Sequence, residues 1–116
     1  MADECRTVTL SVASRDDVVR RIGAALGGEA QGDFITFTTV ELLWKLITPK
    51  RLDILRVLAG QKALSIREAA RRLGRDVKAV HGDVRALVDA GLLDETGSGV
   101  RFDYDTIHVD FTLRAA

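Results

Sequence analysis

The first third of the chain switches between strand-like and helix-like patterns of hydrophobic residues. Residues 6–12 carry an apolar side chain at every second position, which predicts a β-strand with one buried face. Residues 14–26 change to the three- and four-residue spacing of an amphipathic helix. Residues 34–38 return to the strand pattern, and Thr38 with Glu41 has the spacing of a capping box at the start of a short helix. This part therefore predicts strand, helix, strand and helix in that order.

Three helices with clear start signals follow. The first begins at Thr48-Pro49, because proline at the first helical position gives up an N–H that has no partner there in any case. The second begins with Ser65 and Glu68, which form a capping box, and the third begins after Asp76. Glycine ends each helix, at Gly60, Gly74 and Gly91. The positions predicted to face the core are Leu52, Leu55, Leu58, Ile66, Ala69, Ala70, Leu73, Val77, Val80, Val84, Leu87 and Val88.

A hairpin and a last strand complete the pattern. Residues 92–104 contain Gly97-Ser98-Gly99 between apolar flanks, which predicts a β-hairpin, and residues 105–113 alternate as a further strand. Helix, helix, tight turn, helix and hairpin is the layout of a winged helix-turn-helix. We therefore predict an α+β fold in two parts. Residues 1–47 form an N-terminal strand–helix–strand–helix extension for dimerisation or partner binding, and residues 48–116 form a winged helix-turn-helix domain with the closing strand.

Charge is unevenly distributed along the chain, although the formal net charge is +0. Residues 49–91 contain ten Lys or Arg against five Asp or Glu, a local excess of five positive charges. The remaining residues carry the compensating negative excess. A local basic excess attracts a polyanion such as DNA even when the whole chain is neutral.

The third of these helices has the composition of a DNA recognition helix. The small residues Ala79 and Gly82 would let its backbone approach the floor of the major groove, while Lys78 and Arg85 could reach guanine edges or phosphates. Arg75 stands where it could meet a phosphate together with the helix N-terminus. The candidate DNA-binding residues are Lys50, Arg51, Arg67, Arg75, Lys78, Ala79, His81, Gly82, Arg85 and Arg101.

These candidates also have structural interpretations. A Lys or Arg on a helix surface is most often only solvated, and His81 is more typical of a half-buried helix position than of a base reader. Gly82 costs about 1 kcal/mol relative to alanine inside a helix, whatever its role. The hairpin has Asp94 and Glu95 at its base and Arg101 as its cation, so we expect it to contribute little to DNA affinity.

Composition argues against several other classes of protein. A single cysteine, Cys5, allows no intramolecular disulfide and fits a reducing cytoplasm. His81 and His108 stand too far apart to indicate a metal site. No apolar run approaches the roughly 20 residues of a membrane span. Nothing resembles a nucleophile elbow, a phosphate loop or a carboxylate pair, and the capping role explains Ser65. We expect a cytoplasmic protein that is not an enzyme and has no catalytic residues, metal or cofactor.

The chain also resembles a known family. The segments TPKRLDILR, GRDVKAVHGDVRAL and FDYDTIHVDF are similar to those of small prokaryotic MarR-like winged-helix regulators, and the similarity covers residues 34–113. The resemblance implies a winged-helix fold, operator binding, a homodimer, and a frequent genomic position beside a small toxin gene. Ala79 and Gly82 depart from the larger polar residues that are usual in relatives, which weakens the expectation of base-specific contacts at those positions.

Two functional hypotheses follow. The first is a dimeric transcriptional repressor that acts on its own or a neighbouring operon. Its two recognition helices would lie about 34 Å apart on double-stranded DNA. The alternative is an antitoxin or protein-interaction module that neutralises a small toxin protein through the N-terminal segment. The apolar strand faces outside the three-helix region would serve either a second copy or a partner, and they are made of Val8, Leu10, Val12, Ile107, Val109 and Phe111.

Overall fold

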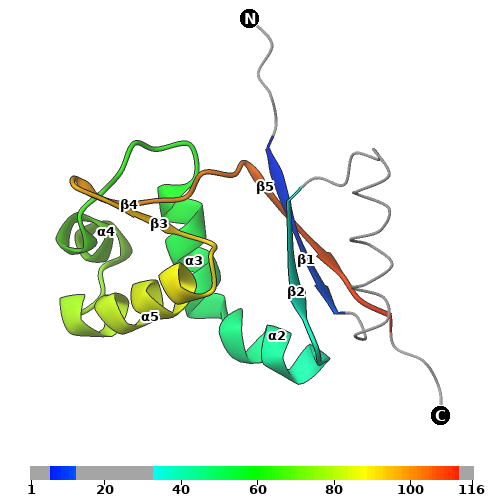
Figure 1. The fold of residues 1–116 in the computed structure, drawn as a ribbon. Coiled ribbons are helices and arrows are strands. Elements are labelled where there is room, and N and C mark those ends of the chain that lie inside the picture. The colour runs from blue at the N-terminus through cyan, green and yellow to red at the C-terminus, as the bar shows by residue number, and fades with distance from the viewer. Residues whose placement is uncertain (1–5, 13–32, 113–116) are drawn as a thin grey trace, which may run out of the picture. The chain divides into compact units, whose positions relative to one another are not determined.

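The computed structural model describes residues 6–12 and 33–112, and these form a mixed α+β structure (Figure 1). The chain divides into two compact units. The first comprises Met1–Lys45 and Thr106–Ala116, and the second comprises Leu46–Asp105. None of the described helices is long and apolar enough to cross a membrane. The helix predicted over residues 14–26 lies outside the described residues.

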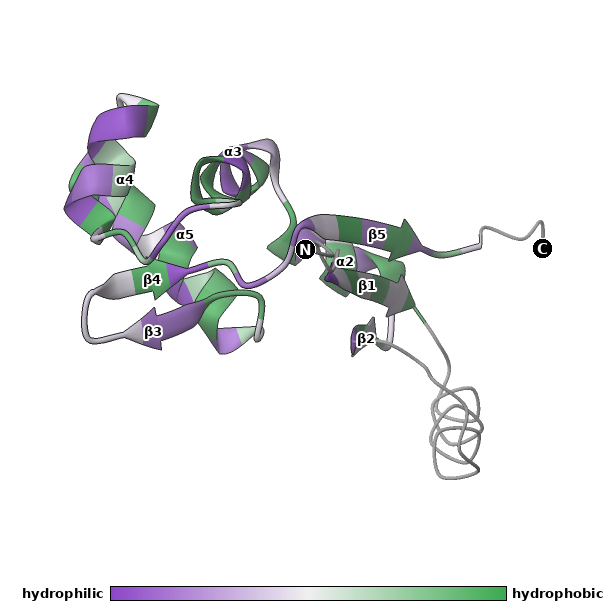
Figure 2. Cartoon of the chain, turned by 90° about the horizontal axis from the view of Figure 1, so that it is seen from above, coloured by the Kyte–Doolittle hydropathy of each residue, from purple (hydrophilic) through white to green (hydrophobic). Residues whose placement is uncertain are grey.

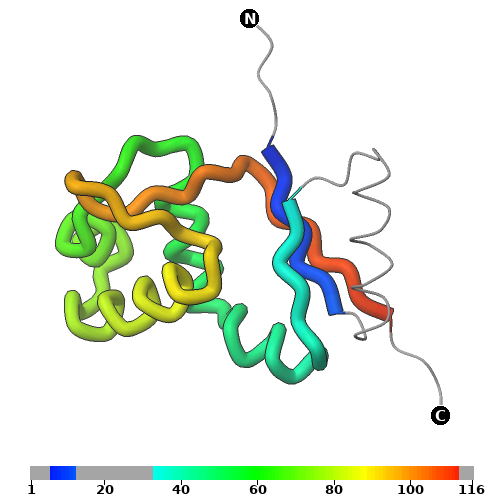
Figure 3. The backbone as a smooth tube through the Cα atoms, viewed as in Figure 1, coloured from blue at the N-terminus to red at the C-terminus, as the bar shows by residue number. Residues whose placement is uncertain are grey.

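The first unit contains a parallel sheet with strand order β2-β1-β5. Its strands are β1 (Thr7–Val12), β2 (Asp33–Phe37) and β5 (Thr106–Asp110). In Figure 3, β5 at the red end of the chain runs alongside β1 at the blue end. The central strand buries Val8 and Leu10 completely. β1 shows the predicted alternation at Val8 and Leu10, but Ser11 is buried as well, and no residue of β2 or β5 is fully buried.

The closing strand belongs to this sheet. The sequence division placed residues 105–113 with the C-terminal part, whereas β5 pairs with β1 in the structure, with Leu10 opposite Val109. A parallel pair needs a long crossover connection, and here the whole second unit provides it.

The helix α2 (Val40–Leu46) follows β2 in the same unit, where Leu43 is buried. The hydroxyl that accepts a hydrogen bond from its first turn belongs to Thr39, which binds the Leu42 N–H at 3.2 Å. The predicted cap at Thr38 is therefore wrong by one residue, because two threonines stand side by side and Thr39 immediately precedes the helix.

The second unit begins with three helices, α3 (Pro49–Leu58), α4 (Ile66–Leu73) and α5 (Val77–Asp89). Their N-caps are the predicted ones. Thr48, Ser65 and Asp76 each accept a hydrogen bond from the backbone N–H three residues later. Gly74 takes the left-handed conformation that ends α4, with φ 65° and ψ 34°. Hydrophobic and hydrophilic residues alternate around α4, as Figure 2 shows.

The core of the second unit is formed by the apolar faces of these helices together with residues around the hairpin. Its buried residues include Ile54, Leu55, Leu58, Ala69, Ala70, Val80, Val84, Leu87, Leu92, Leu93, Val100 and Phe102. Ile54 replaces Leu52 as a buried residue of α3. Val77 was predicted to face inward and is 43% exposed. That prediction is wrong because the first turn of α5 extends beyond the part of the helix that the core covers.

The predicted hairpin consists of β3 (Asp94–Thr96) and β4 (Gly99–Arg101). A third segment joins it: Leu64, just before α4, exchanges two backbone hydrogen bonds with Val100, at 2.9 and 2.8 Å. Gly99 lies beside this bridge with φ 138°, and an added Cβ would stand 2.1 Å from the Leu64 carbonyl oxygen. The hairpin is therefore fastened to the helical part by a contact that requires glycine at this position.

Candidate nucleic-acid interface

The exposed face of α5 carries small and basic side chains over its first three turns, beside the partly exposed Val77. Lys78, Ala79, His81, Gly82 and Arg85 are all exposed. The opposite face is buried through three residues of the same helix, namely Val80, Val84 and Leu87. One side of α5 is therefore packed in the core, and the other side exposes the predicted DNA-binding residues of this helix.

The connection between α4 and α5 is a tight turn over Gly74, Arg75 and Asp76. The Gly74 N–H donates to the carbonyl oxygens of Ala70 and Arg71, which closes α4. The Asp76 carboxylate then accepts from the Ala79 N–H at 3.2 Å, which opens α5. Because so few residues join the two helices, the turn fixes the orientation of α5 relative to α4.

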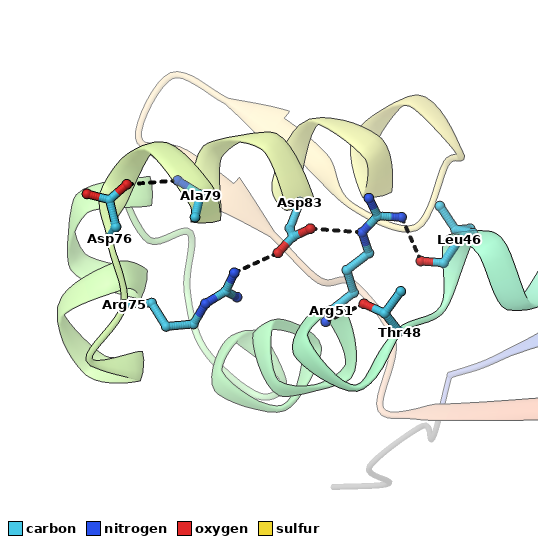
Figure 4. A network of polar contacts seen from close by, with 7 residues as sticks. All are labelled: Leu46, Thr48, Arg51, Arg75, Asp76, Ala79 and Asp83. Carbon is cyan, nitrogen blue, oxygen red and sulfur yellow. Dashed lines mark hydrogen bonds and ion pairs between the residues drawn. The ribbon is translucent and has the colours of Figure 1, made fainter.

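An acidic residue in the middle of α5, Asp83, binds two arginines from outside the helix (Figure 4). Arg51 Nε donates to Asp83 Oδ1 at 3.0 Å, and Arg75 Nη2 donates to Asp83 Oδ2 at 2.8 Å. Arg51 Nη1 also donates to the Leu46 carbonyl oxygen at 2.9 Å. The exposed fractions of the three charged side chains are 21%, 19% and 19% for Arg51, Arg75 and Asp83. One carboxylate thus ties the start of α3, the interhelical turn and α5 together.

The pKa of Asp83 reflects opposing influences. Desolvation by burial acts to raise it, but hydrogen bonds from Arg75 and Arg51, with their positive charges, lower the pKa below the ordinary aspartate value. Asp83 is therefore held as a carboxylate. Arg75 Nη1 is buried and has no hydrogen-bond partner within the part of the chain that the structure describes.

Arg85 is exposed, yet it binds two carboxylates. Its Nη1 lies 3.0 Å from Glu95 Oε1 on β3, and its Nε lies 3.5 Å from Asp89 Oδ1 one turn later on α5. This residue therefore connects the exposed face of α5 to the base of the hairpin. Arg101 on β4 is similarly engaged by Asp103.

Three charged residues of α4 form an ion-pair cluster along the helix. Glu68 accepts from both Arg71, at 2.6 Å, and Arg72, at 2.8 Å. Hydrogen bonds from these two arginines lower the pKa of Glu68 to about 2, and Glu68 in turn raises the pKa of Arg71. The Glu68 carboxylate therefore serves Arg71 and Arg72, while Ser65 supplies the cap that Glu68 was predicted to share.

Four cations of the second unit have no carboxylate partner among the described residues: Lys50, Lys62, Arg67 and Lys78. Three of them stand in the first turn of a helix, Lys50 in α3, Arg67 in α4 and Lys78 in α5. The predicted site residues therefore fall into two groups. Lys50, Arg67 and Lys78 are available for an external anion, whereas Arg51, Arg75, Arg85 and Arg101 are bound to carboxylates of this chain.

The family model HVO_A0114 matches residues 46–109. The chain belongs to the HVO_A0114 family. The match extends over the second unit and into β5, so it contains the exposed face of α5 and the Asp83 contacts. A search of curated proteins finds no match. In the described residues of this HVO_A0114 member, no cluster of three or more His, Cys, Asp or Glu could hold a metal ion.

Sequence analysis missed Asp83 and Glu95 as partners of the candidate cations. Asp83 lies 32 residues from Arg51 along the chain, so no local spacing indicates the contact. A weaker signal was present, because Asp83 stands directly beside the buried Val84, among small and basic residues of α5. A carboxylate at the border of an apolar face needs a cationic partner.

Proposed function

We propose that this protein binds double-stranded DNA and regulates transcription, with the second unit acting as a winged helix-turn-helix. In this proposal α4 and α5 are the two helices of the motif, α5 enters the major groove, and β3 with β4 is the wing. The Leu64–Val100 bridge supports the assignment, because it gives the hairpin a third strand-like segment before the motif.

The main support for this proposal is the exposed face of α5. The acidic residue in the middle of α5, Asp83, binds Arg51 and Arg75, so its carboxylate does not compete with an external anion for Lys78. The nearby Asp76 carboxylate caps the helix at the Ala79 N–H. A Cβ added to Gly82 would meet nothing within 4 Å. The fold therefore gives no reason for glycine there, whereas close approach to a groove floor does.

Phosphate contacts would come from helix starts. Arg67 and Lys78 lie in the first turns of α4 and α5, where backbone N–H groups and the helix dipole also favour an anion. Arg51 and Arg75, which sequence analysis placed among the DNA-binding residues, instead position α5 by holding Asp83. The role in this proposal is that of a dimeric repressor, as the resemblance to MarR-like regulators implies.

A labelled duplex from the region upstream of the protein's own gene tests the proposal by fluorescence anisotropy over a range of salt concentrations. We expect binding that weakens steeply with salt. Lys78→Ala should weaken binding about tenfold and reduce the slope of log K against log salt by about one. Lys62→Ala is the matched control, because Lys62 is also an unpaired exposed lysine but lies outside α5. Equal effects of the two variants, or no binding, would contradict the proposal.

A protein-interaction role is the second candidate. Leu42 and Trp44 on α2 are each 47% exposed, which is unusual for large apolar side chains in one short helix. In that case the duplex would not bind, and a small partner protein would protect α2 from solvent. A shift in the fluorescence of Trp44, the single tryptophan of the chain, on partner binding, together with weaker binding by Leu42→Ala, would identify this surface.

A further inference from the structure

The strand β5 is an edge strand within the described part of the sheet, since the strand order is β2-β1-β5. The Thr106 N–H donates to the Arg6 carbonyl oxygen of the neighbouring segment at 3.2 Å. Backbone groups of successive residues in a strand point to opposite sides. Thr106, His108 and Asp110 therefore direct their N–H and C=O groups toward β1, whereas Ile107 and Val109 direct theirs toward the open edge.

Apolar side chains are also open at this edge. Val109 is 37% exposed and Phe111 is 39% exposed, although Leu10, the residue opposite Val109 on β1, is completely buried. The ring of Phe111 makes a T-shaped contact with Trp44, with centroids 5.7 Å apart. Neither a lysine nor a proline, the usual protections of an exposed edge, occurs in β5.

We propose that a second copy of this chain occupies the edge, with the two β5 strands pairing antiparallel about a two-fold axis at Val109. Such an axis, perpendicular to the sheet, keeps the apolar faces of both sheets on the same side and makes one continuous six-stranded sheet from the described strands. This interface concerns the first unit and does not rest on the proposed DNA binding.

The backbone restricts the possible registers. In an antiparallel pair, two directly opposed residues both exchange hydrogen bonds or both do not. Ile107 and Val109 direct their backbone groups outward, and so does Phe111 if the strand continues. In the dimer, outward-directed residues of the two copies must therefore lie opposite one another. A symmetric pairing must then be centred on a residue and not between two residues.

Charge selects among the registers that remain. Centred on His108, the pairing would oppose two histidines, and centred on Asp110 it would oppose two carboxylates. Centred on Ile107, it would place His108 opposite Thr106 and leave Asp110 beyond the end of the other copy's β5. Centred on Val109, it places each His108 opposite the other copy's Asp110, and each Ile107 opposite the other copy's Phe111. An imidazole N–H can donate to a carboxylate, and an aromatic residue opposite a β-branched one is a favourable cross-strand pair. Of these four registers, the one centred on Val109 pairs an acidic side chain with a basic one and an aromatic side chain with a β-branched one.

Sedimentation equilibrium of the full chain without DNA tests the interface. We expect a dimer. Asp110→Lys should raise its dissociation constant about tenfold or more, because both His–Asp pairs become pairs of two basic residues. The double variant His108→Asp with Asp110→Lys should restore the dimer, because it again places an acidic side chain opposite a basic one. Asp94→Lys, the same change on an exposed residue of the second unit, should leave dimerisation unchanged.

A variant that changes the backbone of β5 tests the interface independently of side-chain charge. Val109→Pro removes an N–H that points away from β1, so the sheet keeps its internal bonds while the dimer loses hydrogen bonds at its axis. We expect a folded monomer, with folding checked by circular dichroism. A wild-type chain that is monomeric at every loading concentration, or a dimer that Asp110→Lys leaves intact, would overturn the proposal. Duplex binding by the same variants is read separately, so failure of this interface and failure of DNA binding are distinguishable.

Discussion

The Asp83 carboxylate stabilises the second unit and also affects the charge on the exposed face of α5. It neutralises Arg51 and Arg75 at a place where all three side chains are about four-fifths covered. Ion pairs this far from solvent are costly to break, because the remaining charges stay desolvated. The same contact removes a negative charge from the side of α5 that we propose to face DNA.

Asp83→Asn should lower the free energy of unfolding by about 2 to 4 kcal/mol, because two largely buried arginines lose their counter-charge. Asp53→Asn is the matched control, since Asp53 pairs with Arg56 on the exposed surface and should cost less than about 1 kcal/mol. Urea denaturation measures both. Similar losses for the two variants would show that Asp83 is not a structural ion-pair partner.

The pH dependence has a defined sign. The folded-state pKa of Asp83 is depressed, so its contribution to stability is present above the unfolded-state pKa and is lost as pH falls through the folded value. Asp83→Asn should therefore flatten the acid side of the stability profile.

At the scale of elements, the attachment of the hairpin depends on Gly99. Gly99→Ala should destabilise the protein by about 3 kcal/mol, because the new methyl group would collide with the Leu64 backbone and the backbone angle suits only glycine. Gly97→Ala, in the same hairpin, meets no atom within 4 Å and should change stability by less than about 0.5 kcal/mol. Thermal unfolding of both variants checks this, and equal melting temperatures would contradict it.

The contact between α5 and β3 gives a prediction about DNA affinity. Glu95→Gln removes one of the two carboxylates bound to Arg85, which then needs less free energy to turn toward a phosphate or base. We expect duplex binding to strengthen about two- to fivefold relative to Asp94→Asn. That control removes the same charge from the neighbouring residue of β3 without releasing Arg85. Equal affinities would mean that Arg85 does not contact DNA.

At the scale of the whole molecule, the sequence predicted what depends on neighbouring residues. The caps at Thr48, Ser65 and Asp76 bind an N–H three residues away, and the hairpin closes over a few residues. It could not predict contacts set by the path of the chain. The bond from Arg51 to Asp83, and the return of β5 to pair with β1 across the entire second unit, have no local signal.

An NMR titration of the 15N-labelled chain with the upstream duplex tests most directly whether the exposed face of α5 contacts DNA. We predict that amide shifts concentrate at Lys78, Ala79 and Gly82 on α5, and at the first turn of α4 around Arg67. Shifts confined to β5 or α2, or no shifts at all on adding the duplex, would contradict the account.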